Sequence, residues 1–343
     1  MNEEGEMKRR DVLRKLSALT AVGVSGLPFA ASALSKDSRS TRPVYQAAVM
    51  RVPVLVPPSL DALNDIRRRN AEAMVDEIEK VARFAAQTPH VIVFPVLQYT
   101  SSRRAVSGVP MEAVAIDLVS EPLDQGIFSP VIDACRRHNL YVATSTQEKV
   151  PQLPGTYFHT GFIMGPEGLV LRSPKVQAPS APTVSYLRDI MTDYEDIFGP
   201  DSIMPVAKTS IGNLACYVEG EAQVLEASRL LATKGAEVIL HTSLESDEVP
   251  WRALKQSIGY QCHVYLLTGT TSRNIYADNP DEEWAGGSAT IVGPDGKLLA
   301  EKKGQDEGFA TAEINLAAVD EARAEFSRDT VPAWSLYSDL YNR

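Results

Sequence analysis

The sequence IGNLACYVEGEAQVLEASRLLATKGAEVILHTS, residues 211–243, decides the fold. An apolar run over residues 211–217 is followed by a segment typical of a helix and by a second apolar run over residues 236–241. Strand, helix and strand in this order predict an α/β domain. Cys216 stands at the end of the first run, where unpaired backbone N–H groups can stabilise a thiolate and hold an oxyanion. The residue is either a nucleophile or, as free cysteines more often are, part of the buried core.

Composition excludes several classes of protein. The chain has 343 residues, of which 44% are hydrophobic and 23% charged, as in ordinary soluble globular proteins. Its formal net charge of −10 argues against a general affinity for nucleic acid or anionic membrane. The three cysteines and five histidines show no metal-ligand spacing, and no glycine-rich nucleotide motif is present. We therefore expect neither a metal nor a cofactor.

The N-terminal segment has the order of an export signal. A basic stretch with paired arginines, KRRDVLRK over residues 8–15, precedes a weakly apolar run and the small residues Ala31-Ser32-Ala33. This order resembles a twin-arginine signal peptide over residues 1–34, followed by a linker over residues 35–44. The run is too rich in Ala, Ser and Gly for a stable membrane anchor. We expect the precursor to meet the twin-arginine export machinery and the mature protein to be periplasmic or secreted. The alternative is a basic N-terminus beside a chance apolar run.

From Tyr45 the chain alternates strand and helix patterns. Hairpins are predicted over residues 157–175 and 286–302, around the similar turns GPEG and GPDG. These patterns predict one α/β domain over residues 45–316, in which two mixed sheets pack face to face with helices outside. Strand–helix alternation alone also fits a doubly wound sheet, and the hairpins favour the mixed sheets. Residues 317–343 are predicted to form a C-terminal arm.

Several motifs resemble the nitrilase superfamily of carbon–nitrogen hydrolases. They are, in order, Phe94-Pro95, the hairpin ending in RSPK at residues 172–175, EDIFGPD at residues 195–201, and residues 211–216. KGAEVI at residues 234–239 and GSATIVGPDG at residues 287–296 are most similar to the aliphatic amidase and formamidase branch. The resemblance covers about residues 45–323. It implies a four-layer αββα sandwich, assembly into homo-oligomers, and hydrolysis of a small non-peptide amide.

The resemblance also implies roles for individual residues. Cys216 matches the nucleophile, whose thiolate attacks an amide or nitrile carbon and forms a thioester that water hydrolyses. Lys175 matches the oxyanion-stabilising lysine, and Glu195 matches the carboxylate that orients it. The substrate pocket is expected to include Tyr217, Gln98, Tyr99 and Trp284. For Tyr99 and Trp284, ordinary packing is at least as good an explanation.

The chain departs from the family's pattern at the general base. The family has a glutamate directly after Phe-Pro, and this chain has Val96, which cannot accept a proton. A general base contributes about 10²–10⁴-fold to the rate, so its loss is a large change. Three explanations remain open: Glu195 acts as the base; another acid such as Glu112, Glu148 or Glu219 does; or the protein no longer hydrolyses anything. In the last case it binds a small amide or carboxylate ligand or serves as an oligomeric interaction module.

Overall fold

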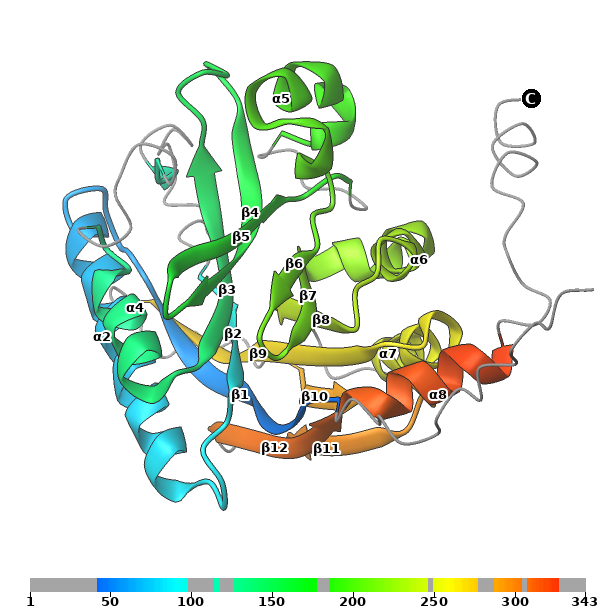
Figure 1. The fold of residues 1–343 in the computed structure, drawn as a ribbon. Helices are drawn as coiled ribbons and strands as arrows, with labels where there is room; N and C mark the ends of the chain where they lie inside the picture. The colour runs from blue at the N-terminus through cyan, green and yellow to red at the C-terminus, as the bar shows by residue number, and fades with distance from the viewer. Residues whose placement is uncertain are drawn as a thin grey trace, which may run out of the picture. The chain divides into compact units, whose positions relative to one another are not determined.

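The strands of the computed structural model form one hydrogen-bonded sheet in the order β5-β4-β3-β2-β1-β9-β8-β7-β6, with β10, β11 and β12 joined to it (Figure 1). The structure describes residues 42–97, 114–117, 126–177, 185–245, 249–276, 287–303 and 307–326. The strands are β1 (Val44–Val56), β2 (Val91–Val96), β3 (Tyr141–Lys149), β4 (Tyr157–Gly165), β5 (Gly168–Pro174), β6 (Ala207–Thr209), β7 (Gly212–Val218), β8 (Val238–Ser243), β9 (Tyr265–Tyr276), β10 (Ala289–Val292), β11 (Leu298–Lys302) and β12 (Gly308–Asn315).

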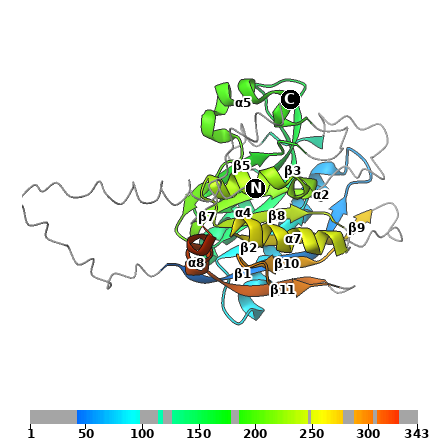
Figure 2. The ribbon, with the colours of Figure 1, turned by 90° about the vertical axis from the view of Figure 1, so that its right-hand side faces the viewer.

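Strand β1 joins the two halves of this sheet. It runs parallel to β2 on one side and to β9 through its last residues, and β12 pairs with its first residues in the antiparallel sense. The register with β9 shifts between Val52 and Val54. Pro53 lies between them and has no backbone N–H to give to a ladder, which accounts for the irregularity. In two views at right angles, β10 and β11 lie beside β1 at one end of the sheet (Figure 2).

The two halves pack face to face. Their shared core contains Val93 of β2, Ile163 of β4, Leu214 of β7 and Leu240 of β8, all without exposed surface. Strand β2 and the first residues of the parallel strands β3, β8 and β9 are apolar runs because both of their faces are covered. The predicted pair of mixed sheets is confirmed, as two halves of one continuous sheet.

Helices cover both outer faces of the folded sheet. They are α2 (Leu63–Phe84), α4 (Ser129–His138), α5 (Met191–Phe198), α6 (Leu225–Thr233), α7 (Val249–Cys262) and α8 (Leu316–Phe326), with 3₁₀ turns η1 (Leu187–Asp189), η2 (Pro200–Ser202) and η3 (Glu219–Gln223). Apolar residues of α2 and α4 pack against β1 to β4, and those of α6 and α7 against β7 to β9. The resulting layers are helix, sheet, sheet and helix, so the α/β sandwich predicted from the sequence is confirmed.

The structure corrects one detail at the end of the domain. The predicted C-terminal arm is wrong for its first part, because residues 316–326 form α8 and its Val319 is fully buried in the inter-sheet core. The predicted signal peptide, residues 1–34, the linker up to residue 41 and residues 327–343 lie outside the described residues.

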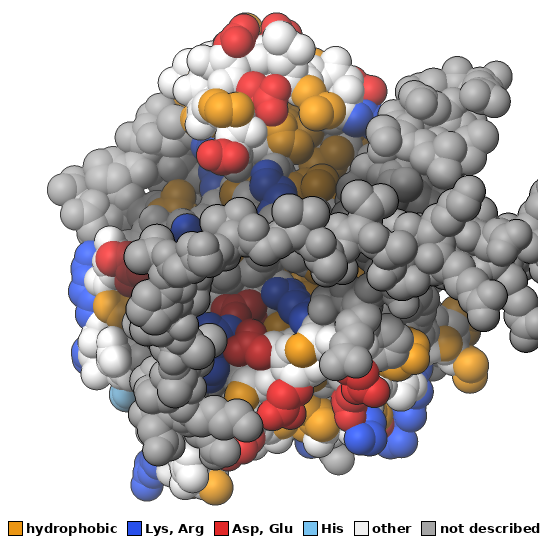
Figure 3. Space-filling model, turned by 45° about the vertical axis from the view of Figure 1, so that its right-hand side comes forward, with side chains coloured by type: hydrophobic (Ala, Val, Ile, Leu, Met, Phe, Trp, Pro, Cys, Tyr) orange, Lys and Arg blue, Asp and Glu red, His pale blue; other side chains and the backbone are white. Residues whose placement is uncertain are grey.

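The surface mixes charges of both signs. On the described part of the face in Figure 3, acidic and basic side chains are interspersed. Such mixing does not create the continuous positive field that a polyanion needs. Of the helices within the described ranges, none has the length and apolarity that crossing a membrane requires.

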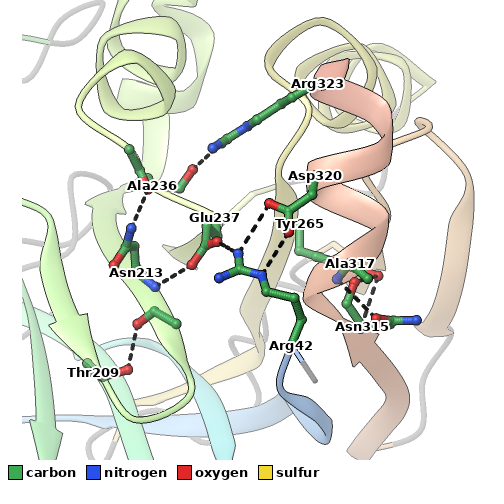
Figure 4. Close-up of polar contacts among 12 residues, drawn as sticks. Arg42, Thr209, Asn213, Ala236, Glu237, Tyr265, Asn315, Ala317, Asp320 and Arg323 are labelled. Carbon is green, nitrogen blue, oxygen red and sulfur yellow. Dashed lines mark hydrogen bonds and ion pairs between the residues drawn. The ribbon is translucent and has the colours of Figure 1, made fainter. Parts of the chain in front are cut away.

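A polar cluster ties the start of the domain to its last helix (Figure 4). The guanidinium of Arg42 contacts the carboxylate of Glu237 and also pairs with Asp320 of α8, Nε to Oδ2, at 2.8 Å. The second oxygen of Glu237 accepts a hydrogen bond from the backbone N–H of Asn213 at 2.8 Å. Arg323 of α8 donates to the backbone oxygen of Ala236 at 2.5 Å. The beginning of β1 and the final helix are thus held on the same edge of β7 and β8.

Candidate functional site

Lys175 is a buried lysine directly after β5. Its side chain is 2% exposed, and its backbone N–H donates to the carbonyl oxygen of His159 in β4 at 2.9 Å. The two strands of the predicted hairpin therefore fix the lysine at their open end. A lysine is rarely buried without a charged partner, so the partner defines the chemistry of this place.

The partner of Lys175 is Glu219, the first residue after β7. The lysine Nζ lies 3.1 Å from Oε2 of Glu219. Glu219 has a φ of 47°, in the left-handed region that a residue with a long side chain seldom adopts. His241 on β8 places Nε2 3.0 Å from the Glu219 carbonyl oxygen and helps to hold this turn. A costly backbone conformation that points a charged side chain at a buried lysine is typical of a functional site.

His159 is the third member of the cluster. Its Nδ1 lies 3.4 Å from Oε2 of Glu219, its side chain is 5% exposed, and its Nε2 has no hydrogen-bond partner in the described part of the chain. Burial lowers the pKa of His159, although the charge of Glu219 acts in the opposite direction. The ring is therefore neutral at neutral pH.

Two carboxylates near Lys175 differ in charge. Burial opposes the ionisation of Glu219, but the charge of Lys175 and the hydrogen bonds from Lys175 and His159 outweigh it and hold the pKa well below its usual value. Glu221 is fully buried, and its Oε1 accepts the backbone N–H of Val176 at 2.8 Å. Burial raises the pKa of Glu221 to about 7, against the effects of backbone N–H groups and Lys175. Glu219 is thus ionised at neutral pH, whereas burial opposes the ionisation of Glu221.

The structure does not bring Cys216 into this cluster. The residue is fully buried in the core between the two halves, and a Cβ atom added to Gly161 of β4 would lie 2.7 Å from its Sγ. Strand β7 continues to Val218, so Cys216 stands inside the strand, and three extended residues span about 10 Å. Burial, followed by the charge of Glu221, raises the pKa of the thiol. This is the environment of a core cysteine rather than of a reactive one.

Among the described residues, neither of the other predicted site residues pairs with Lys175. Glu195 is half-buried on α5, while the ion-pair partner of Lys175 is Glu219. Tyr217 points to the opposite face of β7 from Cys216, where its hydroxyl lies 3.2 Å from the Ser228 hydroxyl of α6. Its position is explained by packing under α6.

The remaining candidates divide into two groups. Gln98, Tyr99, Trp284 and Glu112 lie outside the described residues. Glu148 is fully buried and has its own partners, Arg172 at 3.0 Å and the Thr160 hydroxyl at 2.6 Å. Its carboxylate belongs to a separate network that also includes Tyr194 of α5.

Val96 ends β2 on the same side of the molecule as Glu219. It is paired with Ser145 of β3, whose Oγ accepts a hydrogen bond of 2.7 Å from Thr242 of β8. Thr242 is in turn the register partner of Val218, the residue before Glu219. The carboxyl ends of β2, β3, β7 and β8 therefore converge, although Val96 itself is apolar and 1% exposed.

No group of three or more His, Cys, Asp or Glu residues within the described ranges could hold a metal ion. The chemistry of the cluster is that of one ammonium, one carboxylate and one neutral imidazole. These groups can donate and accept hydrogen bonds and can neutralise charge, and they include no thiol.

Comparison with known proteins places this fold in a family. The model of the carbon-nitrogen hydrolase family matches residues 62–324, and the chain belongs to that family. Nitrilase 1 of Arabidopsis thaliana is 25% identical over 218 residues, which are 59% of each protein. The bifunctional nitrilase/nitrile hydratase NIT4A of Lupinus angustifolius is 26% identical over 153 residues, 40% of this chain and 43% of the plant protein. The chain thus spans about half the length of the curated relatives it matches.

Solved structures show the same fold. Nit3 of Saccharomyces cerevisiae, a member of branch 10 of the nitrilase superfamily, superposes with a TM-score of 0.62 at 16% identity and covers 84% of this chain and 96% of its own. An amidase from Nesterenkonia sp. AN1 superposes with a TM-score of 0.58 at 17% identity over 90% of this chain and all of its own. That amidase is described with the acetamide moiety of fluoroacetamide added covalently at its active site cysteine.

Proposed function

We propose that the Lys175–Glu219–His159 cluster binds a small amide-like ligand and that no thioester forms there. The observation that carries this proposal is that the buried ammonium faces a carboxylate and not a thiol. A carboxylate is a weak nucleophile toward an amide, and one whose pKa is held low is also a weak general base. With an apolar Val96 at the place where the family has its glutamate, the cluster retains groups that recognise a ligand and lacks those that break its bond.

Calorimetric titration with acetamide and propionamide tests this function. We expect binding to be lost in Lys175→Met, because the buried donor is removed, and to change less than about twofold in Cys216→Ala, whose sulfur lies in the inter-sheet core. Cys216→Ala is expected to cost about 1 kcal/mol of stability, since it removes one buried heavy atom. Binding that vanished in Cys216→Ala while the variant remained folded would contradict the proposal.

Hydrolysis of a small amide through a Cys216 thioester, with a displaced general base, is the second candidate function. It is favoured by membership of the carbon-nitrogen hydrolase family and by the amidase among the similar structures. It requires the Cys216 sulfur to become accessible. Ammonia release from formamide, acetamide or propionamide that Cys216→Ala abolishes would establish this candidate in place of the first.

We also propose that the precursor is exported by the twin-arginine machinery and that the mature protein is a periplasmic or secreted homo-oligomer. The support for export is the order of basic, apolar and small residues before residue 35, and the homo-oligomer is what the resemblance to the nitrilase superfamily implies. Replacing Arg9 and Arg10 by lysine is expected to leave the precursor full-length in the cytoplasm, as cell fractionation would show. An unchanged location in that variant would refute export by this route.

A further inference from the structure

Lys175 and Glu219 have hydrogen-bonding capacity that the described residues leave unused. An ammonium has three N–H donors, and Lys175 gives one of them to Oε2 of Glu219. The other oxygen of Glu219, Oε1, accepts no hydrogen bond from the described part of the chain. Spare donors and a spare acceptor therefore lie side by side. Buried polar groups are normally satisfied, so a partner other than the described residues must complete them, and a ligand can be that partner.

Access to these groups is from the side of Glu219. Its side chain is 22% exposed, whereas that of Lys175 is 2% exposed. A molecule arriving from solvent meets the carboxylate before the ammonium. His159 borders the same carboxylate, and its buried Nε2 has no hydrogen-bond partner among the described residues.

The charges of the cluster leave no surplus for an anion. Lys175 and Glu219 neutralise each other, His159 is neutral, and the fully buried Glu221 brings a second carboxyl group near Lys175. A carboxylate ligand would be attracted by the ammonium of Lys175 and repelled by the carboxylate of Glu219. Because these two groups are adjacent, the attraction and the repulsion nearly cancel. A neutral ligand has no such penalty.

We infer that Glu219 makes this site select a neutral primary amide over the carboxylate of the same shape. The inference rests on the proposed function and narrows its ligand class. A primary amide offers a carbonyl acceptor to Lys175 and N–H donors to Glu219, so it is complementary to both kinds of unused group. A carboxylate offers acceptors only, so it cannot satisfy Glu219.

The test is calorimetric titration of the full mature chain with propionamide and with propionate. The natural chain is expected to bind propionamide about ten- to hundredfold more tightly than propionate. Glu219→Gln keeps the shape and leaves Lys175 without its counter-ion, so the preference should invert to propionate. Glu219→Asn also removes the charge and tolerates the left-handed φ better, which provides a second variant if the first folds poorly. Glu313→Gln, an exposed change of the same kind on β12, should leave the preference unaltered.

The outcomes separate the inference from the proposed function. A natural chain that binds propionate as tightly as propionamide would overturn the inference while binding as such stands. A natural chain that binds neither compound would overturn the proposed function, and the inference with it. Two folded variants, Glu219→Gln and Glu219→Asn, that both retain the amide preference would show that Glu219 does not set it.

Discussion

A variant carrying Val96→Glu and Glu219→Cys is expected to release ammonia from acetamide at least about a hundredfold faster than the natural chain. The second substitution puts a thiol at the turn that faces Lys175, whose charge lowers a thiol pKa. The first puts a carboxylate at the end of β2, on the side where β7 ends. A general base contributes about 10²–10⁴-fold, so Glu219→Cys alone should be slower by that factor and Val96→Glu alone inactive.

Two controls make this result interpretable. Adding Cys216→Ala to the double variant should preserve the ammonia release, which assigns the reaction to the new thiol. Thermal unfolding must show that the variant is folded, because Val96 is 1% exposed and a glutamate there is costly to bury. A folded double variant that reacts no faster than Val96→Glu alone would mean that positions 96, 175 and 219 do not share one site.

Gly269→Ala is expected to lower the free energy of unfolding by about 3 kcal/mol or more, measured by urea denaturation. A Cβ atom on this β9 glycine would lie 2.8 Å from the carbonyl carbon of Phe94 and closer still to the Val93 carbonyl oxygen. These are backbone atoms of β2 and cannot rotate away. Overpacking usually costs about 1–3 kcal/mol, and a backbone clash belongs at the upper end. To relieve this clash, β2, the strand that ends at Val96, would have to move.

Gly161→Ala provides the matched comparison. Its added Cβ would meet the Cys216 Sγ at 2.7 Å, a side-chain atom that a second substitution can remove. The pair Gly161→Ala with Cys216→Ala should therefore recover much of the stability lost by Gly161→Ala alone. A Gly269→Ala protein within about 1 kcal/mol of the natural chain would show that the two halves are not in tight contact at this strand.

The architecture was predictable because its signals are local. Apolar runs bounded by turn residues mark β1, β2, β8 and β9, and the two GPxG turns mark both hairpins. The three-residue strand β6 was not anticipated, because so short an edge strand has no periodicity to detect. Lys175 was identified through the family resemblance of the hairpin that ends in RSPK, and the structure gives it a charged partner at 3.1 Å.

The composition of the site was harder to predict because it depends on where β7 ends. The apolar run continues through Val218, so Cys216 remains inside the strand. The first charged residue after the run, Glu219, adopts the left-handed conformation of the turn that follows. Had the end of the strand been placed at Val218, the sequence would have indicated Glu219 as the residue that faces Lys175. No local signal pointed to His159, since a histidine inside an apolar strand reveals its partner only when β4 and β7 face each other.

Residues 44–51 of β1 pair with residues 308–315 of β12, and Arg42 contacts α8 beyond them. Strand β1 is synthesised first, and its hydrogen-bonded ladder is complete only after β12 has been synthesised near the end of the chain. Loop closure over so long a separation is slow, and until it occurs the central strand keeps an unpaired edge. We therefore expect this domain to finish folding only after its synthesis is complete. A nascent chain that stops before residue 308 would lack β12, the strand that pairs with the first residues of β1.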